Sequence, residues 1–323
     1  MLLPKNRADP RAGKGRAMNA SILETIKKSA AVPSMPQVVL RFLEIMQDPE
    51  FNYTDLVKVL SADAGTVSEL LRLANSAMFG VRNKVASTKQ ALTLLGPKRT
   101  RSLLLGRYLV DSMSSKRVVG LDMSYFWRRS LTSSLVATHF AEKVARAQRD
   151  EAFIGALLAD IGIPILAEAM PERYAPIAAQ LAPHCPRITA EQELEAVEVT
   201  HAQVSAMVLA HWTLPSNVSA AVNLHQSDNP GTDNVAKIAR ILHASDRIGT
   251  LLCEVSNEDT IVETCTEAAA FVGVDISTLV QMLPSIESEI EELADALRID
   301  VIPSSVYSLV AQRLTEKLSA SAC

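Results

Sequence analysis

The chain has 323 residues, a length that suits two packed subdomains or one large helical unit rather than a single small core. Hydrophobic residues make up 48% and charged residues 21%, which excludes an intrinsically disordered chain, and the aromatic content of 4% favours packed helices over sheets. The formal net charge of −4 provides no general attraction to nucleic acid or to anionic membranes.

The first 18 residues form a basic tail. Five of them are lysine or arginine and one, Asp9, is acidic, so the tail carries a net charge of +4 and the rest of the chain −8. Their mixture of proline, glycine and basic residues predicts disorder. No apolar run in the tail reaches secretory length, and none elsewhere reaches about 18 residues, so neither a signal peptide nor a membrane span is expected. Met18 is an alternative to Met1 as the start.

The four cysteines are widely spaced and form no CxxC pair. In a chain of this size without a secretion signal, such a pattern predicts reduced thiols and a cytoplasmic protein. A zinc site built on these cysteines is not expected, because structural zinc sites use closely spaced ligand pairs.

Helical signals follow the tail in close succession as far as residue 115. Apolar side chains recur at helical spacing in residues 38–46, and Thr54 and Thr66 are candidate N-caps of two further helices. Ser87 and Gln90 form a capping box, and the Gly-Pro pair at 96–97 ends one helix and starts the next. Five or six short helices predict a compact N-terminal bundle over residues 19–115.

Longer helices are predicted in the rest of the chain. Their expected ranges are 124–147, 150–160, 191–211, 215–226, 233–254, 275–297 and 304–319. A loop is predicted at 183–190, and no segment of useful length alternates at the period of a strand. The predicted fold class is therefore all-α. The N-terminal bundle is expected to pack on a second helical subdomain at 122–228, which C-terminal helices at 232–323 complete.

A series of distinctive motifs lies in order between residues 30 and 228. The motifs are PSMPQVVLRFLEIM at 33–46, LLRLANSAMFG at 70–80, YFWRRSLTSSLVA at 125–137, FIGALLADIG at 153–162 and THAQVSAMVLAHWTLP at 200–215. Together they resemble the HDOD family, a branch related to the HD-domain and HD-GYP phosphohydrolases that is usually described as regulatory. Beyond residue 228, only ILHASDRI at 241–248 has an HD-like pattern.

The resemblance implies where an HD hydrolase would hold its metal. Such an enzyme uses a His from one helix, an adjacent His-Asp pair from another and a later Asp, and the ion turns a bound water into a nucleophile. Here Arg129 stands at the first His position, and Ala159 replaces the His of the pair. An arginine cannot ligate a metal, because it stays protonated and has no free lone pair. We therefore expect no metal, no cofactor and no catalytic residue.

Four residual HD-like positions remain: Asp160, His201, His225 and Asp246. Each also has a purely structural interpretation. Asp160 suits a carboxylate at a helix end that serves backbone N–H groups or an arginine, and Asp246 suits a local polar pair with His243. His201 is expected near a helix N-terminus, and His225 at a helix end, where an imidazolium suits the macrodipole.

A positive side chain is expected to replace the lost metal. Without a cation, Asp160 and Asp246 would face each other as like charges and destabilise the folded state. A planar guanidinium can hold two carboxylates through separate N–H pairs. We therefore predict that Arg129, or failing that Arg128, lies within hydrogen-bonding distance of one of them. The alternative is that both arginines point to solvent beside Trp127.

Three functions follow from these observations. The first is a non-catalytic regulatory module in bacterial-type signal transduction, which docks to another signalling protein of unknown identity. The second is a degenerate phosphohydrolase with a rearranged metal site at Asp160, His201, His225 and Asp246. The third is a nucleic-acid-associated regulator that binds through the basic tail, although nucleic-acid binding is not the expected role. The input signal and the oligomeric state stay open.

Overall fold

The computed structural model describes residues 21–75, 84–114, 118–254, 258–299 and 305–321. All regular secondary structure in these ranges is helical, which confirms the all-α prediction. The predicted disordered tail at 1–18 lies outside the described residues.

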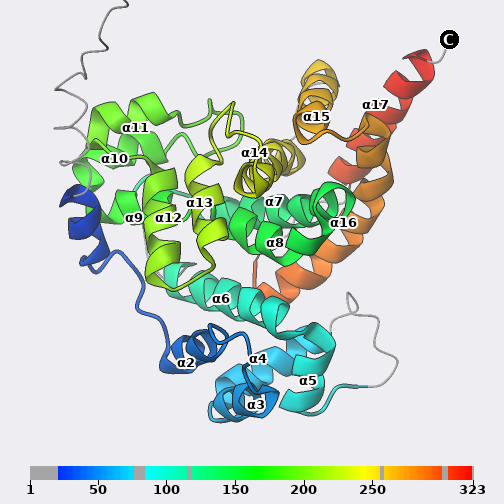
Figure 1. Cartoon of the computed structure of the whole chain (residues 1–323). Helices are drawn as coiled ribbons and strands as arrows, with labels where there is room; N and C mark the ends of the chain where they lie inside the picture. The colour runs from blue at the N-terminus through cyan, green and yellow to red at the C-terminus, as the bar shows by residue number, and fades with distance from the viewer. Residues whose placement is uncertain (1–20, 76–83, 115–117, 255–257, 300–304, 322–323) are drawn as a thin grey trace, which may run out of the picture.

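The N-terminal part of the chain is a group of short helices beneath one longer helix. After a helical segment at 21–27, the helices are α2 (Gln37–Ile45), α3 (Tyr53–Ser61), α4 (Ala64–Ala74), α5 (Thr88–Leu95) and α6 (Pro97–Ser114). The short helices pack on one another and on α6, as Figure 1 shows. Their core includes Phe42, Leu56, Leu60 and Leu92, each 0% exposed. Burial of such side chains supplies most of the stability of short helices.

Two of the N-caps predicted in this bundle are wrong. Asn52 caps α3 through a bond of 2.8 Å from the Thr54 N–H, and Asp63 caps α4 through a bond of 2.6 Å from the Thr66 N–H. The side chain of an N-cap residue accepts a hydrogen bond from the backbone N–H two or three residues later in the chain. Each threonine therefore supplies that backbone N–H and is not the cap. Ser87 does cap α5, as predicted.

The second part of the chain surrounds one long central helix, α7 (Met123–Val144). The elements that follow it are η2 (Arg146–Gln148), α8 (Arg149–Leu158), α9 (Gly162–Ala169), α10 (Pro171–Ala178), α11 (Ala190–Val197), α12 (His201–His211), α13 (Ser216–Leu224) and α14 (Asn234–Cys253). Helix α7 packs against α8, α14 and α6, and α12 packs against α13, which in turn packs against α8 and α14. Figure 1 shows α6 between this group and the N-terminal helices.

Several predicted boundaries in this part need correction. The single helix expected at 191–211 is two helices, because Glu198 takes a left-handed φ of 66° and Thr200 starts α12 with a capping box. Helices α9 and α10 were not predicted, since Gly162 and Pro164 suggested a break after residue 160. In the structure both lie in the first turn of α9, and Pro171 is the first residue of α10, positions where a proline removes no intrahelical hydrogen bond.

Three C-terminal helices complete the fold: α15 (Glu258–Val272), α16 (Ile276–Leu297) and α17 (Ser305–Ser321). The sequence predicted α16 and α17 but not α15. Helix α16 packs against α7 and also reaches α4 and α6, so the C-terminal part of the chain contacts the N-terminal helices.

The stretch Arg146–Ala169, which contains η2, α8 and α9, is apolar and long enough to cross a membrane by composition. In this structure 89% of that apolar window is buried inside the protein. Burial of this extent is typical of the core helices of a globular fold.

Candidate functional site

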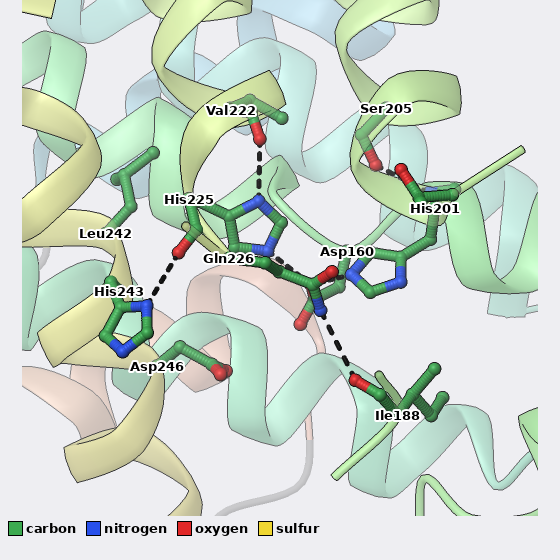
Figure 2. Close-up of polar contacts among 12 residues, drawn as sticks. Asp160, Ile188, His201, Ser205, Val222, His225, Gln226, Leu242, His243 and Asp246 are labelled. Atoms are coloured by element: carbon green, nitrogen blue, oxygen red, sulfur yellow. Dashed lines mark hydrogen bonds and ion pairs between the residues drawn. The ribbon is translucent and has the colours of Figure 1, made fainter. Parts of the chain in front are cut away.

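Five elements bring the HD-like positions together in one place. The converging side chains are Arg129 from α7, Asp160 from the turn between α8 and α9, His201 at the start of α12, His225 at the end of α13, and Asp246 from α14. All five are buried or nearly so. Figure 2 shows both imidazole rings turned toward the Asp160 carboxylate. These five side chains, which are spread over positions 129 to 246 in the sequence, thus form a single polar cluster.

Two glycines allow the backbones around this cluster to approach closely. A Cβ atom on Gly162 would overlap the carbonyl oxygen of His201, so only glycine lets α9 start beside α12. A Cβ on Gly249 would overlap the Ser133 hydroxyl and lie 2.9 Å from the Ser133 backbone nitrogen, where α14 crosses α7. The Gly162 N–H also donates to the Ser205 hydroxyl over 2.8 Å. These contacts hold Asp160 and Asp246 in place.

Arg129 lies between the two carboxylates. Its Nη2 nitrogen donates to Asp160 Oδ2 and lies 2.9 Å from Asp246 Oδ1, so the contact predicted from the sequence is present with both partners. Burial by itself lowers the pKa of Arg129, but Asp246 and Asp160 outweigh burial and raise the pKa above its ordinary value. Arg128 takes no part in this contact, since its guanidinium lies over the Tyr125 ring at 5.7 Å from the centroid.

Asp160 is the central acceptor of the cluster. Its Oδ1 oxygen accepts from His225 Nε2 over 3.2 Å and lies 3.2 Å from His201 Nε2. Burial raises the pKa of this carboxyl, but Arg129 and then the two histidines more than compensate and hold the pKa well below its usual value. Asp160 is therefore an anion that protein groups surround on three sides.

His201 has a second acidic partner that the sequence did not reveal. Its Nδ1 lies 2.8 Å from Glu193 Oε1, and its backbone N–H donates to Glu193 Oε2 over 3.0 Å. Tyr174 donates to the same Oε1 oxygen. Burial lowers the pKa of His201, but Glu193 and Asp160 raise it to about 10. Glu193 thus offsets the cost of an imidazolium at the N-terminus of α12.

His225 and His243 are held by backbone carbonyl groups. His225 Nδ1 lies 2.6 Å from the Val222 oxygen, and its other ring nitrogen faces Asp160. His243 Nδ1 lies 3.0 Å from the His225 oxygen, so the local pair with Asp246 expected from the sequence is not formed (Figure 2). Asp246 turns toward arginines instead, because they offer charged donors that a carboxylate binds more strongly.

Arg187 is the second arginine on Asp246, and the sequence did not point to it. It belongs to the loop between α10 and α11 and donates to Asp246 Oδ2, while 43% of its side chain stays exposed. Arg187 and its loop line a small pocket of about 30 Å³ together with Arg129 and Asp160. No local periodicity could have identified Arg187, because it lies in an irregular segment 59 residues from its partner.

The cluster does not fit the metal that the wider HD group uses. Asp160, His201 and His225 do have potential ligand atoms within 4.8 Å of one another. However, the Arg129 guanidinium already binds Asp160, and a metal ligand histidine must be neutral, whereas His201 stays protonated up to a pKa of about 10. Ala159, buried at the end of α8, supplies no ligand where the HD pair would have its histidine.

The sequence and the fold of this chain are similar to those of known proteins. A curated protein from Treponema pallidum (strain Nichols), named only as uncharacterized, is 24% identical over 208 residues. The match covers 61% of this chain and 38% of that protein, so the chain spans well under half the length of its relative.

Two solved structures share the fold over most of both chains. One is a Shewanella amazonensis SB2B protein, provisionally assigned as a phosphohydrolase, with a TM-score of 0.68 and 20% identity over 86% of this chain and 98% of that chain. The other is an HDOD domain protein of unknown function from Geobacter sulfurreducens, with a TM-score of 0.67 and 17% identity over 87% and 98%. The sequence model of the HDOD domain matches residues 32–228, which is more than half of the chain. The chain therefore belongs to the HDOD family.

Proposed function

We propose that this protein is a non-catalytic regulatory module of cytoplasmic, bacterial signal transduction that acts by docking to another signalling protein. The observation that carries the proposal is the position of Arg129, which binds Asp160 and Asp246 where an HD hydrolase would hold its ion. A fixed guanidinium balances the two carboxylates but cannot generate a metal-bound nucleophile. The fold is kept, and the chemistry that it supports elsewhere is absent from the cluster.

The comparison with solved structures supports a signalling role. A Marinobacter aquaeolei VT8 protein provisionally assigned to signal transduction has a TM-score of 0.58 and 18% identity over 96% of this chain and 68% of that chain. That description applies to the neighbour, and its transfer to this chain is part of the proposal. The HDOD match over residues 32–228 agrees with a regulatory module.

The alternative function is a degenerate metal-dependent phosphohydrolase. It is favoured by the proximity of Asp160, His201 and His225, and by the Shewanella neighbour with its provisional phosphohydrolase assignment. For this enzyme to work, an ion would have to displace Arg129 from Asp160 and remove the proton from His201. Both steps oppose strong charge interactions in a buried site.

Metal content and turnover decide between these two functions. Protein purified without chelators or an affinity metal should contain less than stoichiometric Mn, Fe, Zn or Mg by elemental mass spectrometry. It should not hydrolyse phosphate esters or cyclic dinucleotides above background. The opposite result, one tightly bound transition metal per chain and turnover that Asp160→Ala abolishes, would overturn the proposal in favour of the hydrolase.

Docking is tested by capture of partners on the immobilised full-length chain. We expect a specific signalling protein to be retained from the native cell lysate and to bind again as a purified protein with a measurable Kd. Failure of every retained protein to bind after purification would contradict a docking role.

The basic tail is tested separately, since deletion of residues 1–18 should leave partner binding unchanged. Salt-sensitive nucleic-acid binding that this deletion abolishes would favour the third function.

A further inference from the structure

A row of oxygen-bearing side chains from α14 and its C-terminal end lines the pocket beside Arg129. Asp246 and Thr250 are four residues apart and share one face of α14, and Glu254 is the C-cap residue, which follows the helix in an extended conformation. The rise of the helix separates the backbones of Asp246 and Glu254 by about 12 Å. The row therefore presents acceptors over roughly that length.

The two ends of the row have different partners. Asp246 is held by Arg129 from α7 and by Arg187 from the loop between α10 and α11. Glu254 accepts a hydrogen bond of 2.5 Å from the Tyr125 hydroxyl, and its other oxygen faces the exposed His184 at 3.8 Å. No lysine or arginine of the described chain pairs with Glu254. One end of the row thus has two guanidinium partners, and the other end has none.

Further acceptors without partners line the same pocket. The side-chain oxygens of Gln180 and Gln226 are buried, and neither has a hydrogen-bond donor in the structure. A buried acceptor without a donor is destabilising, so N–H groups delivered into the pocket would be favourable. His201 Nε2 also lacks a well-aligned bond, but it is a donor that already faces Asp160. The side-chain atoms in this pocket that lack a hydrogen-bond partner and could bind a ligand are therefore acceptors.

Arg187 behaves as a tethered occupant of this acceptor row. Its guanidinium reaches into the pocket from the loop between α10 and α11. That loop is also held by the contact of His184 with Glu254, by the buried Ile188 side chain and by a long bond of 3.5 Å from Gln226 Nε2 to the Ile188 oxygen. A small free cation could bind Asp246 in the position that the Arg187 guanidinium now occupies and could also reach Glu254. It would then gain a carboxylate contact that Arg187 does not make.

We infer that this pocket binds a small organic cation with two separated N–H donor groups, guanidinium or ammonium, which displaces Arg187 from Asp246 and releases the loop between α10 and α11. The cation spans from Asp246 to Glu254 and donates to Gln180 and Gln226 on the way. This proposal rests on the proposed function, in which movement of the loop signals to a partner protein. It adds the chemical class of the input signal.

Two probes of matched size test the ligand class on the full-length chain by isothermal titration calorimetry. Agmatine carries a guanidinium at one end and an ammonium at the other, whereas 4-guanidinobutyrate carries a carboxylate in place of the ammonium. Agmatine should bind, and 4-guanidinobutyrate should bind at least about tenfold more weakly, because its carboxylate would face Glu254. Equal binding of the two probes, or no binding of agmatine at millimolar concentration, would overturn the inference.

Variants then locate the bound cation. Glu254→Gln should weaken agmatine binding about tenfold or more, because a charged acceptor becomes neutral. Arg187→Ala should strengthen agmatine binding, because it removes the guanidinium that competes for Asp246. Glu198→Gln is the matched control, since Glu198 belongs to a surface pair with Arg173 at 3.9 Å outside the pocket. Agmatine binding that responds equally to Glu254→Gln and Glu198→Gln would place the cation elsewhere and contradict the inference.

Loop release has its own measurement. Saturating agmatine should increase amide hydrogen exchange in peptides that cover residues 183–189, and Arg187→Ala should increase it without agmatine. Saturated binding with unchanged exchange would contradict the displacement of Arg187. These outcomes are separable from the test of the proposed function, because metal content and partner capture are measured without agmatine.

Discussion

At the scale of single residues, the cluster is a closed set of charges. Arg129, Arg187 and His201 are the cations, and Asp160, Asp246 and Glu193 are the anions in contact with them. Isolated charges are costly to bury, but each of these has an opposite charge within hydrogen-bonding or ion-pair distance. The cluster is therefore stable as a whole and sensitive to the loss of any member.

Removal of the Arg129 guanidinium should show this sensitivity. We expect Arg129→Ala to lower the free energy of unfolding by about 3–5 kcal/mol, because two buried carboxylates lose their shared cation. Arg128→Ala, one residue along the same helix, should cost only about 1 kcal/mol, since Arg128 contacts an aromatic ring and no carboxylate of the cluster. Urea unfolding at neutral pH measures both values, and equal losses for the two variants would show that Arg129 has no special role.

The pH dependence of stability should report His201. Its pKa is raised from 6.5 to about 10 in the folded state, so the stabilisation is fully present below pH 6.5 and is lost as the pH rises toward 10. The stability advantage of the wild type over His201→Gln should therefore shrink across this window, by an amount on the order of 5 kcal/mol. Denaturant titrations of both proteins at several pH values test this, and an advantage that grows with pH would contradict the assignment.

The sequence could predict only part of the cluster at this scale. Arg129 was identifiable because it stands in a motif position where a ligand histidine is expected. Glu193 and Arg187 were not, because their partners lie 8 and 59 residues away across a helix end and an irregular loop. No periodic pattern encodes such contacts.

At the scale of elements, close helix crossings position the cluster. Helix α9 begins against the first residue of α12, and α14 crosses α7 at Gly249. Core packing leaves little room for extra atoms at such crossings. The glycines are therefore part of the site, although they carry no functional group.

Substitution of Gly162 tests the importance of the α9–α12 approach. We expect Gly162→Ala to cost about 1–3 kcal/mol or more, because its Cβ would overlap a backbone carbonyl that cannot rotate away. Gly65→Ala is the control, since its Cβ would lie 3.3 Å from the Asp63 carboxylate, a side-chain contact rather than an overlap with backbone, and alanine favours the helix. Thermal unfolding of both variants distinguishes them, and a Gly162→Ala protein as stable as the control would refute the argument.

At the scale of the whole molecule, α6 and α16 connect the two parts of the chain. Buried Arg107 on α6 donates to the Leu297 oxygen at the end of α16 over 3.0 Å and lies 3.7 Å from Glu69 of α4. Glu69 also pairs with Arg72 at 2.8 Å and with Arg298 at 3.5 Å. The apolar faces of α6 are buried along its length, so the two parts share one continuous core.

A shared core predicts cooperative unfolding. Differential scanning calorimetry of the full chain should show one transition, with the calorimetric enthalpy close to the van 't Hoff enthalpy. Two resolved transitions would show instead that the N-terminal bundle and the rest of the chain unfold independently, and that the division of subdomains near residue 115 is also a division in stability.

What the sequence determined by itself was local. Apolar spacing, the Ser87 cap and the absence of strand patterns were sufficient for the all-α class and for most helices, because these signals act within a few turns. Motif positions were sufficient to expect Arg129 among carboxylates. The tertiary structure alone decided that one arginine holds both aspartates, that Glu193 charges His201, and that Arg187 lines the pocket. Such contacts join distant segments, and the packing of whole helices sets their distances.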